Sequence, residues 1–290
     1  MSNRRTSSKL DTRAIGLDVS LTFARWLTGK ENLHYGYWEG LDVCAANAGT
    51  AQEAYTEKLF GLLPAGPLRI LDIGGGAGET AKKLVALGHT VDIVIPSAFL
   101  AERCRANAPS ATVHMTTFED FSGNGPFDVC LFSESFQYVA LDIGLRKALG
   151  LLTPGGHIIL ADCFRPEGYV ADKARGTVGG GHRMEQFRAE LQKLPLSVMS
   201  EEDITEAVAP SVEIEQGLFN VVGHGLTRVD EEMARKQPRR RWLIHRLIGM
   251  VLSARKRARL ATRLMEQSRN REVFAANNTY LMMVLKRDDG

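Results

Sequence analysis

Between Leu68 and Asp162 the chain alternates short apolar runs with segments of helical spacing, and this alternation constrains the fold more than any other feature. The runs are rich in Val, Ile, Leu and Phe, as in strands that are buried on both faces. They occupy Leu68–Ile73, Thr90–Ile95, Thr112–Met115, Phe127–Phe132 and His157–Asp162. Strands separated by helices in this way predict an α/β fold, with a mostly parallel sheet and helices on both of its faces.

Composition sets the limits of this fold. The chain has 290 residues, 44% of them hydrophobic and 24% charged, which suits one large domain with room for an insertion. No apolar run is long enough to cross a membrane, and the polar segment 1–13 predicts no secretory signal. The cysteines lack the spacing of a zinc site and predict reduced thiols in a cytoplasmic protein; they are Cys44, Cys104, Cys130 and Cys163.

A glycine-rich loop follows the first predicted strand. Ile70–Thr80 reads ILDIGGGAGET, so that the strand ends in Asp72 and glycines recur at 74, 76 and 78 before a helix begins. Glycine lets the backbone approach a ligand closely, and the free amides of a helix N-terminus favour anionic groups. The loop also fits the GxGxxA pattern of dinucleotide sites, which is weak evidence when it stands alone.

Two further motifs follow in order. Phe127-Asp128-Val129 opens the fourth strand, and LLTPGG at 151–156 leads into the fifth strand, HIILAD. Over about 33–163, and more loosely in the terminal strand, the chain resembles class I S-adenosylmethionine-dependent methyltransferases. The resemblance implies S-adenosyl-L-methionine as the cofactor. It also implies a Rossmann-like, mostly parallel seven-stranded sheet with an antiparallel last strand and a helical cap.

The same resemblance implies where the cofactor binds. Its methionine and ribose would lie over Gly74, Gly76 and Gly78 beside Asp72, and its adenine near Phe118 and Glu119. Ser97 and Ser133, which follow the second and fourth strands, are further candidates for cofactor binding.

The family usually ends its second strand in an acid that binds both ribose hydroxyls, but Ile95 stands there. Loss of that acceptor would weaken cofactor binding by ~1.5–3 kcal/mol. Asp92 comes too early in the strand to replace it, and Ser97 could supply one uncharged contact. The missing acid also counts against NAD as the cofactor.

An aromatic strip precedes the core. Leu33–Trp38 reads LHYGYW and resembles the strip of methyltransferases that act on small amines, prenylated phenols and fatty acyl chains. The resemblance implies that the strip folds over the cofactor, with Tyr35 and Tyr37 shaping the pocket, and aromatic faces can attract a sulfonium by ~0.5–2 kcal/mol. The alternative is a packed aromatic loop that leaves His34 on the surface.

Three residues are candidates for a catalytic base: His34, Glu134 and His182. Glu134 follows the fourth strand, where the strand ends of a parallel sheet meet the ligand crevice. His182 follows three glycines in the segment after the fifth strand, and an imidazole suits proton removal near neutral pH. The alternatives are a structural carboxylate at Glu134 and a solvated histidine at position 182.

The charge is distributed unevenly. Residues 235–271 hold thirteen Lys and Arg against one acid, Glu266, so this segment carries +12 and the rest of the chain −10. Helix 239–259 within it has an apolar face, which could lie on an anionic membrane surface or pack onto the sheet and leave the arginines in water. We find no recognised nucleic-acid-binding module, and the total charge is only +2.

These observations predict the following organisation. Residues 1–28 form an N-terminal tail and the start of a cap, and 29–163 form the cofactor-binding core. Residues 164–275 form a substrate-cap insertion that includes a core strand near 211–218, and 276–290 hold the terminal core strand. The predicted function is S-adenosylmethionine-dependent methylation of a small, lipophilic molecule; the alternative is a non-catalytic scaffold with the same fold. The methyl acceptor and the oligomeric state stay open.

Overall fold

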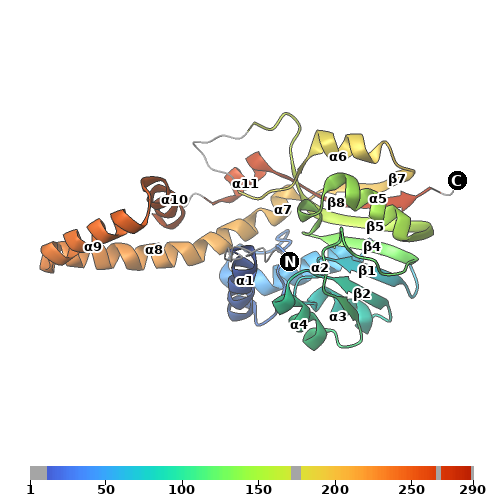
Figure 1. Cartoon of the computed structure of the whole chain (residues 1–290), viewed down its shortest axis with the longest axis horizontal. Helices are drawn as coiled ribbons and strands as arrows, with labels where there is room; N and C mark the ends of the chain where they lie inside the picture. The colour runs from blue at the N-terminus through green and yellow to red at the C-terminus, as the bar shows by residue number, and fades with distance from the viewer. Residues whose placement is uncertain (1–11, 171–177, 266–268, 289–290) are drawn as a thin grey trace, which may run out of the picture.

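The computed structural model describes residues 12–170, 178–265 and 269–288 (Figure 1). Its strands are β1 Arg69–Ile73, β2 Thr90–Val94, β3 Thr112–His114, β4 Phe127–Ser133, β5 Leu152–Arg165, β6 His182–Arg183, β7 Leu196–Asp203 and β8 Thr279–Arg287. Its helices are α1 Thr12–Thr28, α2 Ala48–Phe60, α3 Glu79–Ala86, α4 Ala98–Asn107, α5 Leu141–Leu151, α6 Met184–Leu191, α7 Thr205–Val208, α8 Pro210–Lys236, α9 Pro238–Val251, α10 Ala254–Met265 and α11 Arg271–Asn277, with short 3-10 turns at Ala45–Asn47 and Phe136–Tyr138.

One sheet organises the molecule. Its long strands lie in the order β3-β2-β1-β4-β5-β8-β7, and the two-residue β6 pairs with β5. The strands from β3 to β5 are mutually parallel, whereas β8 runs antiparallel to both β5 and β7. The predicted mostly parallel sheet with an antiparallel last strand is therefore confirmed.

Helices cover both faces of the sheet because its central strands are apolar on both sides. One face packs against side chains of α2, α3 and α4 and the start of α8; Tyr55, Leu84, Cys104 and Val212 are fully buried there. The other face packs against α5 and α6, with Phe136, Leu145 and Phe187 fully buried. Ser97 caps α4, since its Oγ accepts from the backbone N–H of Leu100 at 3.3 Å.

The strand order reverses direction between β1 and β4, which are neighbours in the sheet although β2 and β3 separate them in sequence. At such a reversal the loops after the strands diverge and open a crevice at the carboxyl edge of the sheet. The loops after β1, β2 and β4 all meet at this edge, so the fold brings Asp72, Ile95 and Glu134 together.

A helical arm leaves the body beyond α7 (Figure 1). Helix α8 has 27 residues, which corresponds to about 40 Å at 1.5 Å per residue. Helix α9 returns along it, and α10 then packs against the middle of α8, where Leu264 meets Gly223. The predicted strand near 211–218 is therefore wrong, because Ser211–Leu218 lies in α8. Strand β7 takes the sheet edge instead. Of the two alternatives for the basic helix, packing onto the sheet is wrong, since α9 has no buried residue.

Candidate functional site

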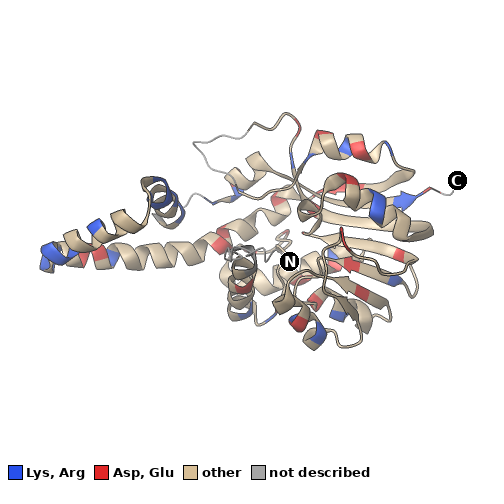
Figure 2. Cartoon of the chain, in the orientation of Figure 1, with Lys and Arg blue, Asp and Glu red and all other residues tan. Residues whose placement is uncertain are grey.

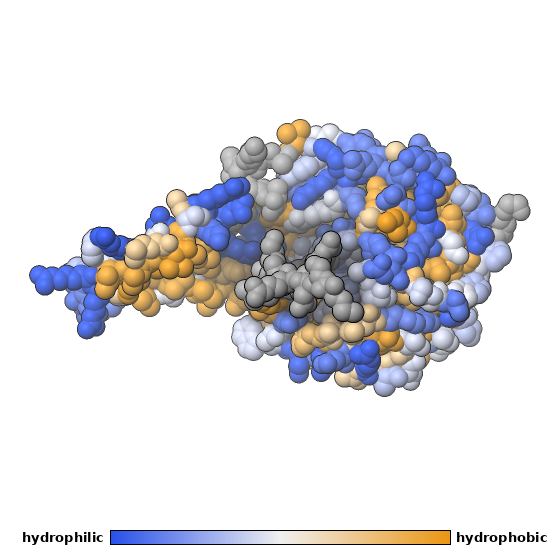
Figure 3. All heavy atoms as spheres, in the orientation of Figure 1, coloured by the Kyte–Doolittle hydropathy of each residue, from blue (hydrophilic) through white to orange (hydrophobic). Residues whose placement is uncertain are grey.

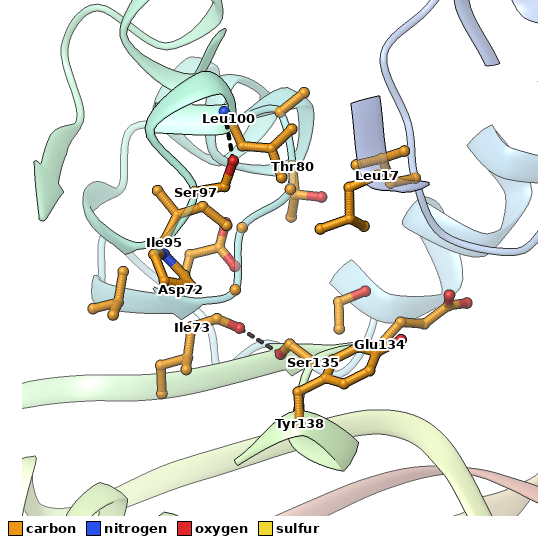
Figure 4. A pocket seen from close by; sticks show the side chains of 18 of the residues that line it. Leu17, Asp72, Ile73, Thr80, Ile95, Ser97, Leu100, Glu134, Ser135 and Tyr138 are labelled. Atoms are coloured by element: carbon orange, nitrogen blue, oxygen red, sulfur yellow. Dashed lines mark hydrogen bonds between the residues drawn. The ribbon is translucent and has the colours of Figure 1, made fainter. Parts of the chain in front are cut away.

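A cavity of about 680 Å³ opens at the crevice between the loops after β1, β2 and β4 (Figure 4). Helix α1 and the aromatic strip cover it from the opposite side, and Leu17 of α1 faces Ile95 and Ser97 across it. Its walls include these predicted site residues: His34, Asp72, Gly74, Gly76, Ser97, Phe118, Glu119, Ser133 and Glu134. The fold thus gathers nine predicted residues in one place.

Asp72 lies at the floor of the cavity, at the end of β1. It is 1% exposed, and its Oδ2 atom has no hydrogen-bond partner among the described residues. Burial raises the pKa of Asp72 to about 7. A buried carboxylate oxygen without a donor costs free energy, so this atom is suited to a ligand that brings a donor or a positive charge.

The glycine loop encloses this carboxylate. A Cβ at Gly75 would lie 2.5 Å from Oδ2 of Asp72, so a larger residue there would collide with the carboxylate. Gly76 has a φ of 55°, and a Cβ on it would meet only Leu33, at 3.8 Å. Gly78 does not line the cavity; a Cβ there would come within 2.8 Å of the Cys104 backbone, so Gly78 lets α3 pack closely on α4.

At position 95, where the family resemblance implies an acid, the wall after β2 is apolar. Ile95 is 5% exposed and lines the cavity next to Pro96 and Ser97. Asp92 lies inside the strand, where its Oδ1 is 2.7 Å from Nε2 of His114. Asp92 therefore has a structural partner and does not line the cavity.

The wall formed by Thr117–Glu119 combines an aromatic ring and a carboxylate. Phe118 is buried edge-on against Phe132, with ring centroids 5.6 Å apart. Glu119 accepts a hydrogen bond from the backbone N–H of Ala140 through Oε1, at 3.1 Å. A flat, partly polar ligand could contact the ring and the carboxylate at the same time.

Glu134 lies at the floor of the cavity in a strained backbone conformation. Its φ of 54° is rare for a residue other than glycine and costs about 1–3 kcal/mol. Its Oε1 accepts from the backbone N–H of Tyr35 at 2.7 Å and from the hydroxyl of Tyr280 at 3.0 Å. Burial raises the pKa of Glu134 to about 8, and these hydrogen bonds only partly oppose it. Its ionised form is therefore a stronger base than an ordinary carboxylate and becomes the main form above about pH 8.

A chain of hydroxyls connects Glu134 to Ser133. Because Tyr280 donates to Glu134, the hydroxyl of Tyr55 must donate to Tyr280, 2.7 Å away. Ser133 lies 3.2 Å from the Tyr55 hydroxyl and can then donate to it. Both ends of this chain line the cavity, while Tyr55 and Tyr280 are fully buried.

His34 is partly buried and neutral. Its Nδ1 lies 2.8 Å from the carbonyl oxygen of Tyr35, which can only accept, so Nδ1 carries the proton. Burial lowers the pKa of His34 to about 4, and its ring stacks on Tyr55 with centroids 4.5 Å apart. The alternative of a surface histidine is therefore wrong. The unprotonated Nε2 has only a long contact, 3.4 Å to Thr56 Oγ1.

A second cavity of about 180 Å³ lies on the other side of the strip. It shares Ser20, Asn32, Leu33 and His34 with the first cavity. Its remaining walls come from α1, α2, the strip, the base of α8 and Arg263 of α10. They include these apolar side chains: Val19, Phe23, Leu27, Ile214, Leu218 and Phe219.

Besides Gly78, three predicted site residues lie outside the first cavity. Tyr35 lines the second cavity and not the first, because the strip turns between His34 and Gly36. Tyr37 lines neither cavity; its hydroxyl donates to Glu39, and Lys58 lies over its ring at 4.9 Å. His182 is also outside both, with Nε2 3.1 Å and 3.0 Å from the carbonyl oxygens of Phe136 and Val139. His182 therefore anchors the turn after β4.

The sequence did not point to several residues that line the first cavity. Gly16, Leu17 and Ser20 of α1 and Thr80 of α3 are among them. Thr80 lies two residues after Gly78, in the first turn of α3. Its place at the start of a helix that faces the predicted ligand site could have identified it from the sequence. The α1 residues carry no motif, because they contribute by closing the cavity and their positions depend on tertiary packing.

The chain is similar to known methyltransferases. A family model described as "Methyltransferase domain" matches residues 71–160. The 27-O-demethylrifamycin SV methyltransferase of Amycolatopsis mediterranei (strain S699) is 30% identical over 203 residues, which cover 62% of this chain and 72% of that protein.

Two solved structures share the fold at low sequence identity. The cyclopropane synthase MmaA2 of Mycobacterium tuberculosis has a TM-score of 0.69 at 16% identity, over 93% of this chain and 95% of that one. The geranyl diphosphate C-methyltransferase of Streptomyces coelicolor A3(2) has a TM-score of 0.63 at 15% identity, over 92% of each chain. That structure contains S-adenosyl-L-homocysteine.

Proposed function

Since this chain belongs to the class I S-adenosylmethionine-dependent methyltransferases, we propose that it binds S-adenosyl-L-methionine in the larger cavity and methylates a small lipophilic molecule. The observation that carries the proposal is the unpartnered Oδ2 of Asp72 beneath the glycine loop. When bound, the cofactor would supply a methyl group on a sulfonium, which passes in line to the acceptor as the carbon–sulfur bond breaks and the thioether leaves, so the protein's task is alignment.

Asp72 and the glycine loop would hold the methionine end of the cofactor. A cationic ammonium beside Oδ2 would supply the missing donor and stabilise the ionised carboxylate, lowering its pKa from about 7. Gly76 leaves the space above the loop open, because a Cβ there would meet nothing closer than 3.8 Å.

The other end of the cofactor would lie between β2 and the Phe118 turn. Ser97 offers a hydroxyl to the ribose, and Ile95 offers only apolar contact. Phe118 and Glu119 would contact the adenine, where the carboxylate can accept from its amine. Nothing on this wall replaces the charged pair of hydrogen bonds that an acid would make at position 95.

The acceptor would occupy the smaller cavity, which adjoins the larger one at His34 and Leu33. Its mostly apolar walls support a lipophilic acceptor, and they support a substrate-cap role for residues 164–275, since α8 and α10 contribute to them. The rifamycin methyltransferase relative and the geranyl diphosphate methyltransferase likewise act on small molecules, as their names state.

Two groups could remove a proton from a hydroxyl or carbon acceptor. His34 has a free Nε2 lone pair and a pKa of about 4, so it is unprotonated at neutral pH but weakly basic. Glu134, with a pKa of about 8, is the stronger base and is polarised by Tyr280. We propose Glu134 as the base and His34 as an orienting group. An amine acceptor would need neither.

A cytoplasmic location is part of the same proposal. It is supported by the buried thiols of Cys104, Cys130 and Cys163, which suit a reducing compartment.

Calorimetric titration with S-adenosylmethionine, S-adenosylhomocysteine and NAD tests the proposal. We expect micromolar binding of the first two and none of NAD. Binding of NAD alone, or of none of the three, would overturn the cofactor assignment.

A further inference from the structure

The arm carries apolar side chains that are largely exposed in the described structure. On α9, Trp242 is 61% exposed and Val251 80%, and no residue of this helix is buried. Exposed apolar residues continue along α8, at Val221, Val222, Leu226 and Val229. Figure 3 shows hydrophobic atoms running along the arm, with hydrophilic atoms at its free end. Apolar groups gathered in this way mark an interaction surface.

The same arm is strongly basic (Figure 2). Residues 237–265, which include α9 and α10, contain nine Lys and Arg and no Asp or Glu. At the free end Arg239 and Arg240 are exposed, and on α9 the guanidinium of Arg246 lies 5.3 Å from the Trp242 ring. The apolar surface is therefore surrounded by cations.

Polar contacts fasten α9 to α8. Asp230 of α8 accepts two hydrogen bonds from Arg241, at 2.9 and 2.8 Å, and its Oδ1 lies 2.7 Å from Nε2 of His245. The exposed apolar residues of α9 are thus free for another partner while the hairpin stays intact.

We infer that this arm docks on the surface of an anionic lipid bilayer. A basic helix with Trp and aliphatic residues on one face lies in the membrane interface, its apolar side among the acyl chains and its cations at the anionic headgroups. No helix of the described residues is long and apolar enough to cross a membrane, so the arm would lie on the surface. The inference does not depend on the cofactor assignment.

Two other partners fit the surface less well. A symmetric contact with a second copy would place two basic hairpins against each other, and like charges would repel. A nucleic acid would neutralise the arginines but leave the side chains of Trp242, Leu243, Leu247 and Val251 in water. A bilayer satisfies both the charge and the apolar area.

Vesicle co-sedimentation of the full chain tests this inference. The probes are vesicles of phosphatidylcholine alone and vesicles with about 30% phosphatidylglycerol. We expect binding to the anionic vesicles only, weakened by high salt. The double variants Trp242→Ser/Leu247→Ser and Arg239→Gln/Arg240→Gln should each lower the partition coefficient roughly tenfold or more.

Matched variants away from the arm serve as controls. Leu87→Ser removes an apolar residue that is 61% exposed, and Arg105→Gln/Arg146→Gln removes two cations from the body. These should bind vesicles as the unaltered protein does, and circular dichroism should show equal helix content in all variants. Absence of binding to anionic vesicles, or equal loss in arm and control variants, would overturn the inference. So would a dimer in sedimentation velocity that Trp242→Ser/Leu247→Ser abolishes.

Discussion

The hydroxyl of Tyr280, on the last strand of the sheet, donates a hydrogen bond to Glu134 Oε1 across 3.0 Å. The contact joins the antiparallel β8 to the loop after β4 and connects the buried interior to the cavity. Glu134 keeps its unusual backbone conformation and its high pKa in this setting. The sequence showed Glu134 as a candidate, but its partner lies 146 residues away.

Glu134→Gln should change how stability depends on pH. The pKa of Glu134 rises from 4.5 to about 8 on folding, so its contribution to stability is complete below about pH 4.5 and is lost as the pH rises toward 8. Glutamine has no proton to lose. The unfolding free energy of the unaltered protein, relative to the variant, should therefore fall by up to about 1.4 kcal/mol per pH unit between these limits. Urea unfolding at several pH values measures this, and a flat difference would contradict it.

Asp72→Asn should weaken binding of ligands that carry the methionine ammonium. We expect at least a tenfold loss of affinity for S-adenosylhomocysteine, the scale of one charged hydrogen bond of about 1.5–3 kcal/mol. Affinity for 5′-methylthioadenosine, which lacks the ammonium, should change little. Calorimetry at pH 7 should also show proton release on S-adenosylhomocysteine binding in the unaltered protein and none in the variant. An equal loss of affinity for both ligands would show that Asp72 does not bind the methionine ammonium.

Ile95→Asp should strengthen cofactor binding and weaken the fold. A carboxylate at this wall would offer the ribose hydroxyls a charged acceptor, worth about 1.5–3 kcal/mol, or roughly ten- to a hundredfold in affinity. Ile95 also packs in the core at 5% exposure, so its loss should lower the unfolding free energy by about 2–5 kcal/mol. Ile95→Asn controls for size without charge. Unchanged affinity in the Asp variant would show that the ribose does not contact this wall.

His34 should stay neutral far below the pH at which a free histidine gains its proton. Its pKa of about 4 reflects burial, only partly offset by the contact with the Tyr35 carbonyl. Nuclear magnetic resonance of the imidazole carbons should show one histidine whose shift does not change above about pH 5. His34→Gln identifies that resonance by its disappearance. If the resonance that disappears titrates near 6.5, the ring is exposed to solvent.

Two glycines of α8 should respond oppositely to alanine. A Cβ at Gly223 would overlap the carbonyl oxygen of Leu264, so Gly223→Ala should separate α10 from α8 and destabilise the arm. Gly225 has no atom within 4 Å of such a Cβ, and Gly225→Ala should stabilise the helix by about 0.5–1 kcal/mol. Hydrogen exchange of α8 and α10 amides measures both. Similar effects at the two positions would contradict the close crossing.

The parallel half of the sheet could be predicted from the sequence because its strands are buried on both faces. β1, β2 and β4 therefore read as continuous apolar runs. β7 could not, since it is an edge strand whose residues after Leu196 are exposed and mostly polar. The alternation of Val212 and Ile214 suggested a strand, but Pro210 stands at the first position of α8, where proline favours a helix start.

The site was predictable where residues follow strand ends and not where they depend on distant packing. Asp72, Ser97 and Ser133 reach the cavity because strand ends share one edge of the sheet. Tyr37 and His182 have suitable side chains and lie close in sequence to predicted site segments. In the structure both lie outside the cavity, where Tyr37 bonds to Glu39 and His182 to the carbonyl oxygen of Phe136. The scaffold alternative rested on Ile95 alone, and the relationship to methyltransferases favours the enzyme.

The basic segment 237–265, which includes α9 and α10, also separates charge along the molecule. It carries +9 while the whole chain carries +2, so the remainder carries −7. Because the arm extends from the body, this distribution amounts to a large electric dipole along the long axis (Figure 2). Near any negatively charged surface the molecule would feel a torque before it makes contact, and it would arrive with the arm leading and the cavity-bearing body held away.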